Sequence, residues 1–401
     1  MRLFIIENGL KDAVGHHYHQ AAGLQREARR RGIETRFYVH RKALKEIVAA
    51  LDARPVFSYR PYGTASRDPL CGPLEDLFHI GDRFAAACSA LVDDGLTKDD
   101  IVYVATAMQN EVYGCARWLR AFPKDETPFI VLNFQVENYL DGDTQKANSV
   151  AVLYRFAARA LAAGIPDERI LFTAGTDAFA KRLGQLTLRP VSRYPMPVSY
   201  DHAVEPANGA RAVDPDRPVV VSILGSSREE KGWLLIPGIV RLCTATNPKL
   251  SFFIQVTPEN MARAWKGSYE EMRAMANVEF HLGPATETEY VDFVRRSDIV
   301  LLPYDYRAWT GRTSGVFADA TGFGKVTVVP RSTWMAEQLD GDRGAGTVFE
   351  QQTPESVASA VGQAMAGIDG LRAKAEHCAG AWRREENIGA FLDRMLSDIR
   401  G

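Results

Sequence analysis

The sequence has few cysteines and no pattern that pairs them. Its five cysteines, Cys71, Cys88, Cys115, Cys243 and Cys378, are scattered and never form a C-x-x-C pair. This spacing predicts neither a disulfide framework nor a zinc site, so we interpret them as reduced thiols of the core. Long apolar runs are absent too, because no stretch approaches the roughly 18 unbroken apolar residues of a membrane-spanning helix. The amino-terminal stretch MRLFIIENGL lacks the apolar core and cleavage site of a secretory signal, so we expect a cytoplasmic protein.

The sequence also lacks an excess of charge of either sign. Its formal net charge is −2, which gives no basic field and argues against nucleic acid as the main partner. One local exception is QREARRRGIETR, residues 25–36, which as a basic helix face could touch anionic lipid head groups at a membrane surface. The alternative is a solvated helix face that ends at Gly32.

The length and the pattern of apolar runs predict two domains of the α/β class. A chain of 401 residues is most simply two domains of roughly 200 residues each, with a cleft between them. Short β-branched or aromatic runs alternate with stretches of helical period, which predicts parallel sheets covered by helices on both faces. The expected strands are 3–6, 36–39, 101–105, 129–133 and 170–174 in the first half, and 219–225, 252–256, 278–280, 299–303, 326–330 and 347–349 in the second. We therefore expect two doubly wound, Rossmann-like sheets.

Composition places the domain boundaries. Residues 189–218 are rich in Pro, Gly and Asp and poor in periodic apolar positions, which indicates a linker. We expect an amino-terminal domain over 1–195, the linker proper over 196–218, a second domain over 219–380, and a last helix over 381–401 that packs back toward the first domain. A polar Pro/Gly segment over 55–73 interrupts the first half, and it either grips a ligand at the rim of the sheet or is a plain surface excursion.

The stretch VVVSILGSSREEKGW, residues 219–233, predicts an anion site. An apolar strand ends at Gly225, and a polar turn then carries Arg228 and Lys231 just before a glycine and a helix. Two cations at the carboxyl end of a strand, beside helix-terminus amides, suit a diphosphate. Neither the Walker pattern nor G-x-G-x-x-G is present. The alternative is that both cations pair with Glu229 and Glu230 on a surface turn.

A second stretch, TSGVFADATGFGKV, residues 313–326, complements the first. If Thr313 or Ser314 caps a helix that begins at Gly315, the amides of Ser314, Gly315 and Val316 point toward the same crevice and can hold a phosphate oxygen. Asp319 lies one turn deeper on the same helix face, where a carboxylate can accept hydrogen bonds from a ribose diol. Taken alone, Asp319 is more typical of a surface helix acid, and its place after the Ser-Gly cap and beside the cationic turn favours the ribose site.

These motifs, in this order, carry a resemblance to a known family. The succession GSSREEKG, SDIVLLPY, SGVFADATGFGKVTVV and GAGTVFEQQTPESVASAV resembles the retaining nucleotide-sugar glycosyltransferases of family 4, which have the GT-B fold of two Rossmann-like domains. The stretch GHHYHQAAGLQREARRRGIETRFYV resembles, more loosely, their first βαβ unit.

The resemblance implies a donor site in the second half. Lys231 matches the family lysine on the donor diphosphate, and Asp319 matches the second acid of the paired-Glu motif, which binds the ribose. Two positions depart from the pattern: the arginine after the strand-end glycine is Ser226 here, so Arg228 is the remaining cation, and the first acid of the pair falls on Gly311. The expected donor-binding set is Gly15, Gly225, Ser226, Arg228, Lys231, Tyr304, Ser314, Gly315, Val316 and Asp319.

The first half supplies the expected acceptor side. His16 and His17 follow the first strand and open the first helix, and Glu137 and Asn138 follow the strand at 129–133. Both pairs are placed at the carboxyl edge of the sheet. A capping or core-edge role is the alternative for Glu137 and Asn138. Two adjacent histidines in a loop rarely chelate one ion and no Asp-x-Asp partner is present, so we expect neither a metal nor another cofactor.

The expected function is therefore transfer of a hexose, with retention and without a metal, from a UDP- or GDP-linked sugar to a glycan, lipid-linked or protein acceptor. Lys231, Arg228 and His17 are the expected catalytic residues. A nucleotide-sugar epimerase or a phosphorylase on the same scaffold is one alternative. A non-catalytic protein that binds sugar nucleotides or glycans is another, given Ser226 and Gly311. A dehydrogenase is disfavoured, because neither half has the glycine fingerprint followed by an acid about 20 residues on.

Overall fold

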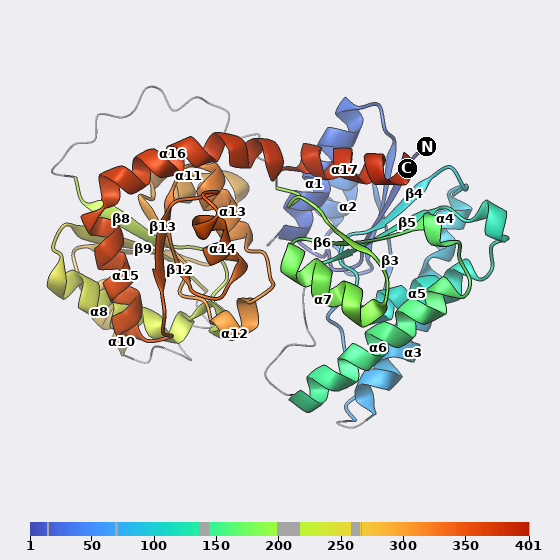
Figure 1. Cartoon of the computed structure of the whole chain (residues 1–401), viewed down its shortest axis with the longest axis horizontal. Coiled ribbons are helices and arrows are strands. Elements are labelled where there is room, and N and C mark those ends of the chain that lie inside the picture. Colours follow the sequence, from blue (N-terminus) through green and yellow to red (C-terminus); the bar gives the residue numbers. More distant parts are fainter. Residues whose placement is uncertain are drawn as a thin grey trace. The chain divides into compact units, whose positions relative to one another are not determined.

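The computed structural model divides the chain into two compact units (Figure 1). One unit combines Met1–Pro197 with Ile388–Gly401, and the other is Val198–Asn387. The structure describes residues 1–13, 16–68, 71–135, 144–198, 217–257, 265 and 267–400, and for residues 16 and 144–149 the backbone alone. The two units are described separately below.

The first unit has a seven-stranded parallel sheet in the order β3-β2-β1-β4-β5-β6-β7. Its strands are β1 (Leu3–Glu7), β2 (Thr35–His40), β3 (Ala53–Phe57), β4 (Ile101–Val104), β5 (Phe129–Phe134), β6 (Ile170–Ala174) and β7 (Val191–Arg193). The five strands expected in this half are all present. Because β2 and β4 lie on either side of β1, the chain reverses its direction of progress between β1 and β4, which is a topological switch point.

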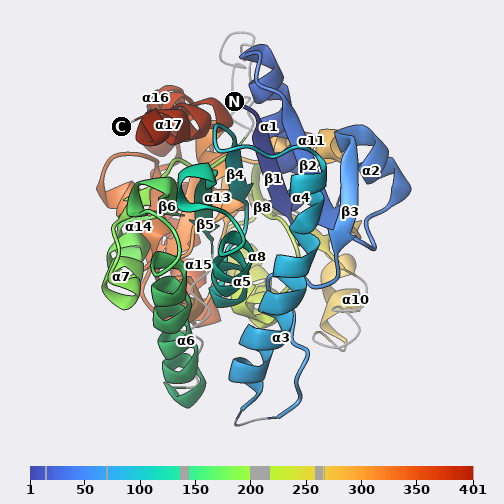
Figure 2. The ribbon, with the colours of Figure 1, turned by 90° about the vertical axis from the view of Figure 1, so that its right-hand side faces the viewer.

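Helices cover both faces of this sheet (Figure 2). One face carries α1 (His16–Arg30), α2 (Lys45–Leu51) and α17 (Ile388–Arg400). The other carries α3 (Gly72–Ala87), α4 (Ser89–Asp93), α5 (Gln109–Leu119), α6 (Thr144–Ala162) and α7 (Asp177–Thr187). Alternate residues of each strand face the two layers, so the strands read as nearly continuous apolar runs.

The two strands that were not predicted lie at the edges of this sheet. β3 has the sequence ARPVF, in which Arg54 and Pro55 hide the strand pattern. Pro55 is tolerated because an edge strand has one side that needs no hydrogen bond, and the register against β2 shifts between Val39 and His40. The segment 55–73 was expected to be irregular throughout, but its first residues, Pro55 to Phe57, belong to β3.

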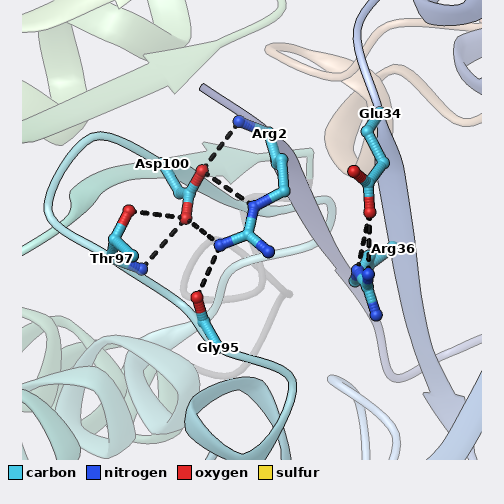
Figure 3. A network of polar contacts seen from close by, with 6 residues as sticks. All are labelled: Arg2, Glu34, Arg36, Gly95, Thr97 and Asp100. Atoms are coloured by element: carbon cyan, nitrogen blue, oxygen red, sulfur yellow. Dashed lines mark hydrogen bonds and ion pairs between the residues drawn. The ribbon is translucent and has the colours of Figure 1, made fainter.

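At the amino edge of the sheet, a polar network fixes the ends of neighbouring strands (Figure 3). The Asp100 carboxylate accepts hydrogen bonds from the Arg2 backbone N–H at 2.8 Å, from the Arg2 guanidinium at 2.6 Å, and from Thr97 N and Oγ1 at 2.9 Å. Arg2 precedes β1 and Asp100 precedes β4, so this pair holds the two central strands in register. Arg36 pairs with Glu34 at the start of β2, at 2.8 Å.

α17 is the last helix and belongs to the first unit. Residues 381–385, which were expected to begin it, are the end of α16 in the second unit. The apolar side of α17 is buried beside α1 (Figure 1), with Phe391 in edge contact with the rings of Tyr103 and Tyr194. Arg31 pairs with Asp393 of this helix and with Glu27 of α1. Part of the basic stretch 25–36 thus docks α17.

The second unit has a six-stranded parallel sheet in the order β10-β9-β8-β11-β12-β13. Its strands are β8 (Val219–Ile223), β9 (Leu250–Val256), β10 (Val278–Leu282), β11 (Ile299–Leu301), β12 (Val326–Pro330) and β13 (Gly346–Phe349). All six were expected. The helices are α8 (Ile236–Thr246), α10 (Ser268–Arg273), α11 (Glu287–Arg296), α12 (Tyr306–Trp309), α13 (Gly315–Gly322), α14 (Trp334–Asp340), α15 (Pro354–Ala366) and α16 (Ile368–Glu385). The prediction of two doubly wound α/β sheets is confirmed.

The described helices of the second unit also lie in two layers. α8, α10 and α15 pack on one face of the sheet, whereas α11 and α13 pack on the other. α16 packs against α13, where Phe317, Trp334 and Trp382 form a cluster of three rings. The switch point of this sheet lies between β8 and β11. None of the helices in the described ranges combines the length and apolar character needed to cross a membrane.

Candidate functional site

The two stretches singled out in the second half of the sequence flank the switch point of their sheet. The turn over 224–232 follows β8, and the segment over 302–314 follows β11 and leads into α13. Because the carboxyl ends of adjacent parallel strands lie at one edge, the two loops meet there. Such a switch point is where open α/β sheets bind ligands.

The turn after β8 depends on two glycines. Gly225 has φ +90° and Gly232 has φ +70°, conformations that residues with a Cβ rarely adopt. A Cβ on Gly232 would lie 1.7 Å from the carbonyl oxygen of Pro303, at the end of β11. The Glu230 carbonyl accepts a hydrogen bond from the Asp305 N–H at 2.9 Å. These contacts fix the turn against the loop that follows β11.

Lys231 projects from this turn into the switch point. A Cβ on Gly225 would lie 3.1 Å from Lys231 Nζ and 3.3 Å from Val316 Cγ2, so these three residues meet at one place. Lys231 Nζ also lies 5.4 Å from the centre of the Tyr304 ring. Burial, and then the charge of Arg228, lower the pKa of Lys231 to about 8, while Glu230 opposes the shift. The ammonium is poorly solvated, which favours binding of an anion.

The start of α13 supplies hydrogen-bond donors beside Lys231. Ser314 is the N-cap, and its Oγ accepts a hydrogen bond from the Phe317 N–H at 3.3 Å. The first N–H groups of a helix have no acceptor within the helix, and the positive end of the helix dipole lies there. Gly315 is exposed and a Cβ there would meet nothing within 4 Å, so the first turn is open to a ligand. The predicted cap and helix start are confirmed in position.

Tyr304 closes this corner from the β11 side. The side chain is 2% exposed, and its burial raises the pKa of the phenol, with a smaller opposing effect of Ser314. Its ring stacks at a tilt on Trp309, at 4.4 Å between ring centres. The indole N–H of Trp309 donates to the Glu230 carbonyl at 3.1 Å, which ties this ring pair to the Lys231 turn.

Asp319 lies one turn along α13 from Val316. Its Oδ2 accepts a hydrogen bond from the Tyr290 hydroxyl of α11 at 3.0 Å. Burial raises the pKa of Asp319 to about 7, and the Tyr290 hydrogen bond opposes the shift. Tyr290 and Val316 pack in one apolar cluster with Leu224, the residue before Gly225. Asp319 and Lys231 therefore lie in the same region of the unit. Val316, one turn before Asp319 on α13, faces Gly225 beside Lys231.

Arg228 and Ser226 are exposed at the outer part of the turn. The Arg228 guanidinium pairs with Glu230 Oε1 at 3.1 Å, as the alternative interpretation of this turn anticipated for one of the two cations. Arg228 thus contacts a residue of its own loop, whereas five of the predicted residues lie close together. These are Gly225, Lys231, Tyr304, Ser314 and Val316. Gly311, at the position of the first family acid, is buried.

The first unit holds one of the predicted acceptor-side residues in a defined contact. His17 Nδ1 lies 3.0 Å from Glu7 Oε1, at the end of β1. Burial lowers the pKa of His17, but the Glu7 carboxylate raises it by more, so the net shift is upward. Gly15, Glu137 and Asn138 lie outside the described residues, as does the side chain of His16.

Sequence reasoning missed several polar partners at these edges. Gln255, at the end of β9, accepts a hydrogen bond from the Gly225 N–H at 2.8 Å and so shapes the turn. Glu111 of α5 is fully buried beside β1, where it accepts a hydrogen bond from Asn8 Nδ2 at 2.9 Å, and burial raises its pKa to about 8. A polar residue at a strand's carboxyl end was a usable signal for Glu7 and Gln255. Tyr290 and Glu111 gave none, because their roles arise from tertiary contacts.

Within the described residues, no three His, Cys, Asp or Glu side chains gather closely enough to hold a metal ion.

Comparison with solved structures shows the fold. An α,α-trehalose-phosphate synthase (UDP-forming) from Burkholderia xenovorans, in complex with glucose-6-phosphate, is similar over 100% of both chains with a TM-score of 0.67 and 15% identity. Alr3699/HepE from Anabaena, in complex with UDP, is similar over 99% of this chain and 100% of its own, with a TM-score of 0.64 and 12% identity. A glycosyltransferase from Rickettsia africae is similar over 100% of this chain and 98% of its own, with a TM-score of 0.65 and 10% identity.

No model of a protein family and no curated protein matches the sequence. The structural likeness extends over both units, and the chain has the GT-B fold of two Rossmann-like domains that the motifs predicted.

Proposed function

We propose that this protein is a glycosyltransferase that moves a sugar from a nucleoside-diphosphate sugar to an acceptor. The observation that carries the proposal is the meeting of Lys231 Nζ, Gly225 and the start of α13 at the switch point of the second unit. A cation, a glycine that allows close approach and a free helix terminus are the groups that bind a diphosphate. The fold supports this assignment, since the similar solved structures include ones in complex with UDP and UDP-glucose.

The donor is assigned to the second unit residue by residue. Lys231 and the amides of Gly315 and Val316 hold the diphosphate, and the Asp319 carboxylate accepts hydrogen bonds from the ribose hydroxyls. Tyr304, packed under Lys231, forms a wall of the site. Ser226 leaves the diphosphate without one of the family's cations, and Gly311 leaves the sugar ring without the contact of the first family acid. Donor selectivity therefore rests on other residues, and we assign a UDP- or GDP-linked hexose as the donor class.

The chemistry follows from where charge develops. When the bond from the sugar C1 to the phosphate oxygen breaks, negative charge grows on the leaving diphosphate, and Lys231 with the α13 amides stabilises it without a metal. Arg228 adds a second cation if it leaves Glu230. The acceptor hydroxyl then bonds to C1 on the face from which the diphosphate departs, which gives retention. Its proton passes to the leaving diphosphate. His17, held by Glu7, positions the acceptor hydroxyl in the first unit.

The acceptor is assigned by class to a glycan, a lipid-linked sugar or a protein. A lipid-linked acceptor would bring the protein to a membrane surface, where Arg29 and Arg30, which are exposed at the end of α1, would interact with anionic head groups.

Transfer of labelled sugar tests the proposal. The purified chain is incubated with radiolabelled UDP-glucose, UDP-galactose or GDP-mannose and with extracted glycans, lipids and proteins, with and without EDTA. Label in an acceptor, undiminished by EDTA, is the expected result, and NMR of the product should show the anomeric configuration of the donor. Interconversion of the free nucleotide sugars would identify an epimerase instead. Tight nucleotide binding without any turnover would identify a binding protein.

A further inference from the structure

Three neighbouring loops of the first unit each present a cation at the carboxyl edge of the sheet. Lys11 follows β1, Lys42 follows β2 and Arg60 follows β3, and these strands are adjacent in the order β3-β2-β1. We call these three residues the cationic triad. None of them belongs to the donor site of the second unit.

Hydrogen bonds hold the three loops together. The Leu44 N–H donates to the Lys11 carbonyl at 2.8 Å, which joins the first loop to the second. His40, 3% exposed, joins the second loop to the third, because its Nε2 lies 3.1 Å from the Ser58 carbonyl oxygen and its Nδ1 accepts from the Lys42 N–H at 3.0 Å. The imidazole is therefore neutral, with its proton on Nε2. The triad stands on a fixed platform rather than on three independent loops.

The triad is short of negative charge. Among the described residues, neither Lys42 nor Arg60 has a carboxylate within ion-pair distance, whereas Arg2, Arg31 and Arg36 of the same unit each have one. Asp12 is the acid that acts on Lys11. Burial, followed by the charges of Arg60 and Lys42, lowers the pKa of Lys11 despite Asp12. Three cations carried by loops that are hydrogen-bonded to one another favour a multivalent anion.

The neighbours of the triad give this anion a context. Arg60 also acts on His17, whose pKa its charge lowers against the larger effect of Glu7. The Leu10 N–H donates to the Glu7 carbonyl at 3.1 Å, so the loop that carries Lys11 begins at the Glu7–His17 pair, which is assigned to the acceptor.

We propose that the cationic triad binds a phosphoryl group of the acceptor, so that the substrate is a phosphorylated sugar or a phosphate-bearing lipid. This inference rests on the proposed function. A phosphate monoester or diphosphate suits the triad, because Arg60 can hold two of its oxygens at once while Lys11 and Lys42 each contact one as point charges. Because the phosphate and the acceptor hydroxyl belong to one substrate molecule, anchoring the phosphate at the triad also positions the hydroxyl relative to His17.

Binding of defined probes to the full chain tests the triad. The probes are inorganic phosphate, glucose 6-phosphate, and vesicles of phosphatidylcholine with or without 10% phosphatidic acid, all in 150 mM salt. The variant is the triple substitution Lys11→Gln, Lys42→Gln and Arg60→Gln. The matched control, Arg36→Gln, Lys98→Gln and Lys124→Gln, removes the same charge near the amino edge of the same sheet.

The expected result is that glucose 6-phosphate or the phosphatidic acid vesicles bind the wild type and the control at least tenfold more tightly than the triad variant. The probe that binds identifies the source of the phosphoryl group. Equal binding by the triad variant and the control, or no binding of any probe by the wild type, would overturn the proposal. Titration of UDP into the same proteins separates the two claims: its affinity should be equal in all three, and failure of UDP to bind would count against the proposed function instead.

Discussion

Lys231 and Asp319 are the two side chains on which the proposed donor site depends. Both are ionisable groups that burial has shifted toward neutrality, Lys231 to a pKa of about 8 and Asp319 to about 7. Shifts of this kind are common at sites that bind charged ligands. Their opposite signs allow the two contributions to be separated experimentally.

The first prediction concerns Lys231 and pH. Because the ammonium loses its charge as the pH rises through about 8, the affinity for UDP should fall between pH 7.5 and pH 8.5, a range above the last ionisation of the diphosphate and below that of the uracil N3–H. Lys231→Met should weaken UDP binding by roughly 100-fold at pH 7, since a charge-assisted contact contributes about 1.5–3 kcal/mol. Calorimetric titration across this range checks both results, with Lys374→Met as a control on an exposed lysine of α16 that pairs with Asp342. If Lys231→Met still loses affinity for UDP at alkaline pH, Lys231 is not part of the site.

The second prediction concerns Asp319. Asp319→Asn should weaken UDP binding about tenfold and leave binding of pyrophosphate unchanged, because we assign the carboxylate to the ribose alone. The substitution should not lower the melting temperature at pH 8. The raised pKa means that ionisation of Asp319 opposes folding as the pH rises from about 4 to about 7, and the amide never ionises. Comparison of the two ligands by thermal shift gives the answer, and equal losses for UDP and pyrophosphate would contradict the ribose assignment.

The third prediction concerns stability in acid. Burial raises the pKa of Asp100, but the hydrogen bonds from Arg2 and Thr97 lower it to about 2. A depressed carboxyl pKa stabilises the fold above the unfolded value near 3.8, and this stability, about 2 kcal/mol, is lost as the pH falls from about 4 to about 2. Asp100→Asn should therefore lower the free energy of unfolding in urea at pH 7 by about that amount or more. The difference from the wild type should shrink at pH 2.5. A constant difference would mean that the charge is irrelevant.

At the scale of elements, the proposed donor site consists of one turn and one helix start. Neither would be in place without the other, because Gly232 contacts Pro303, and the carbonyl of Glu230 accepts from Asp305 and Trp309. The site is thus supported by contacts between loops rather than by regular structure alone.

The fourth prediction concerns the cap of α13. Ser314→Ala removes the acceptor for the Phe317 N–H and should lower stability by about 1 kcal/mol. It should also weaken UDP binding severalfold, because we assign the diphosphate to the first turn of α13. The matched control is Thr353→Ala, which removes the equivalent cap of α15. Chemical denaturation should show similar losses for both variants, and titration should show weaker UDP binding for Ser314→Ala alone. Equal UDP affinity in the two variants would exclude α13 from the site.

The sequence predicted the strands well where they are buried on both faces. β1, β4, β8 and β11 are nearly continuous apolar runs, broken only by Glu7 and Ser222, because helices cover both sides of them. β3 was not predicted, since an edge strand can contain Arg54 and Pro55 without losing its pairing to β2. Edge position is a property of the sheet, not of the segment.

Within the candidate site, local patterns placed the cap, the glycine turn and Lys231. They could not show that Arg228 pairs with Glu230, nor that Tyr290 reaches Asp319 from a different helix. Those contacts join residues whose proximity depends on the loop conformation or on the packing of α11 against α13.

At the scale of the whole chain, each unit has its own sheet and core, and the chain returns to the first unit through α17. The first unit is therefore completed only after the second has been synthesised. Its core depends on residues nearly four hundred positions from β1.

The fifth prediction tests this dependence. Phe391 is 1% exposed and contacts the rings of Tyr103 and Tyr194, so Phe391→Ala should destabilise the first unit by about 3–5 kcal/mol. Asp393→Ala, on the exposed side of α17, should cost no more than about 1 kcal/mol. Differential scanning calorimetry with and without UDP checks this. The Phe391→Ala variant should lose melting temperature in one transition, while the UDP-stabilised transition of the second unit stays in place. A single transition lowered for both units would contradict independent cores.

The most direct test of the donor site is a crystal structure of the chain with the nucleoside diphosphate that gives the largest thermal shift among UDP, GDP, ADP and CDP. The account predicts the diphosphate between Lys231 Nζ and the first amides of α13, with the ribose hydroxyls on the Asp319 carboxylate. A nucleotide bound away from the β8–β11 switch point, or one whose phosphates make no contact with Lys231, would contradict it.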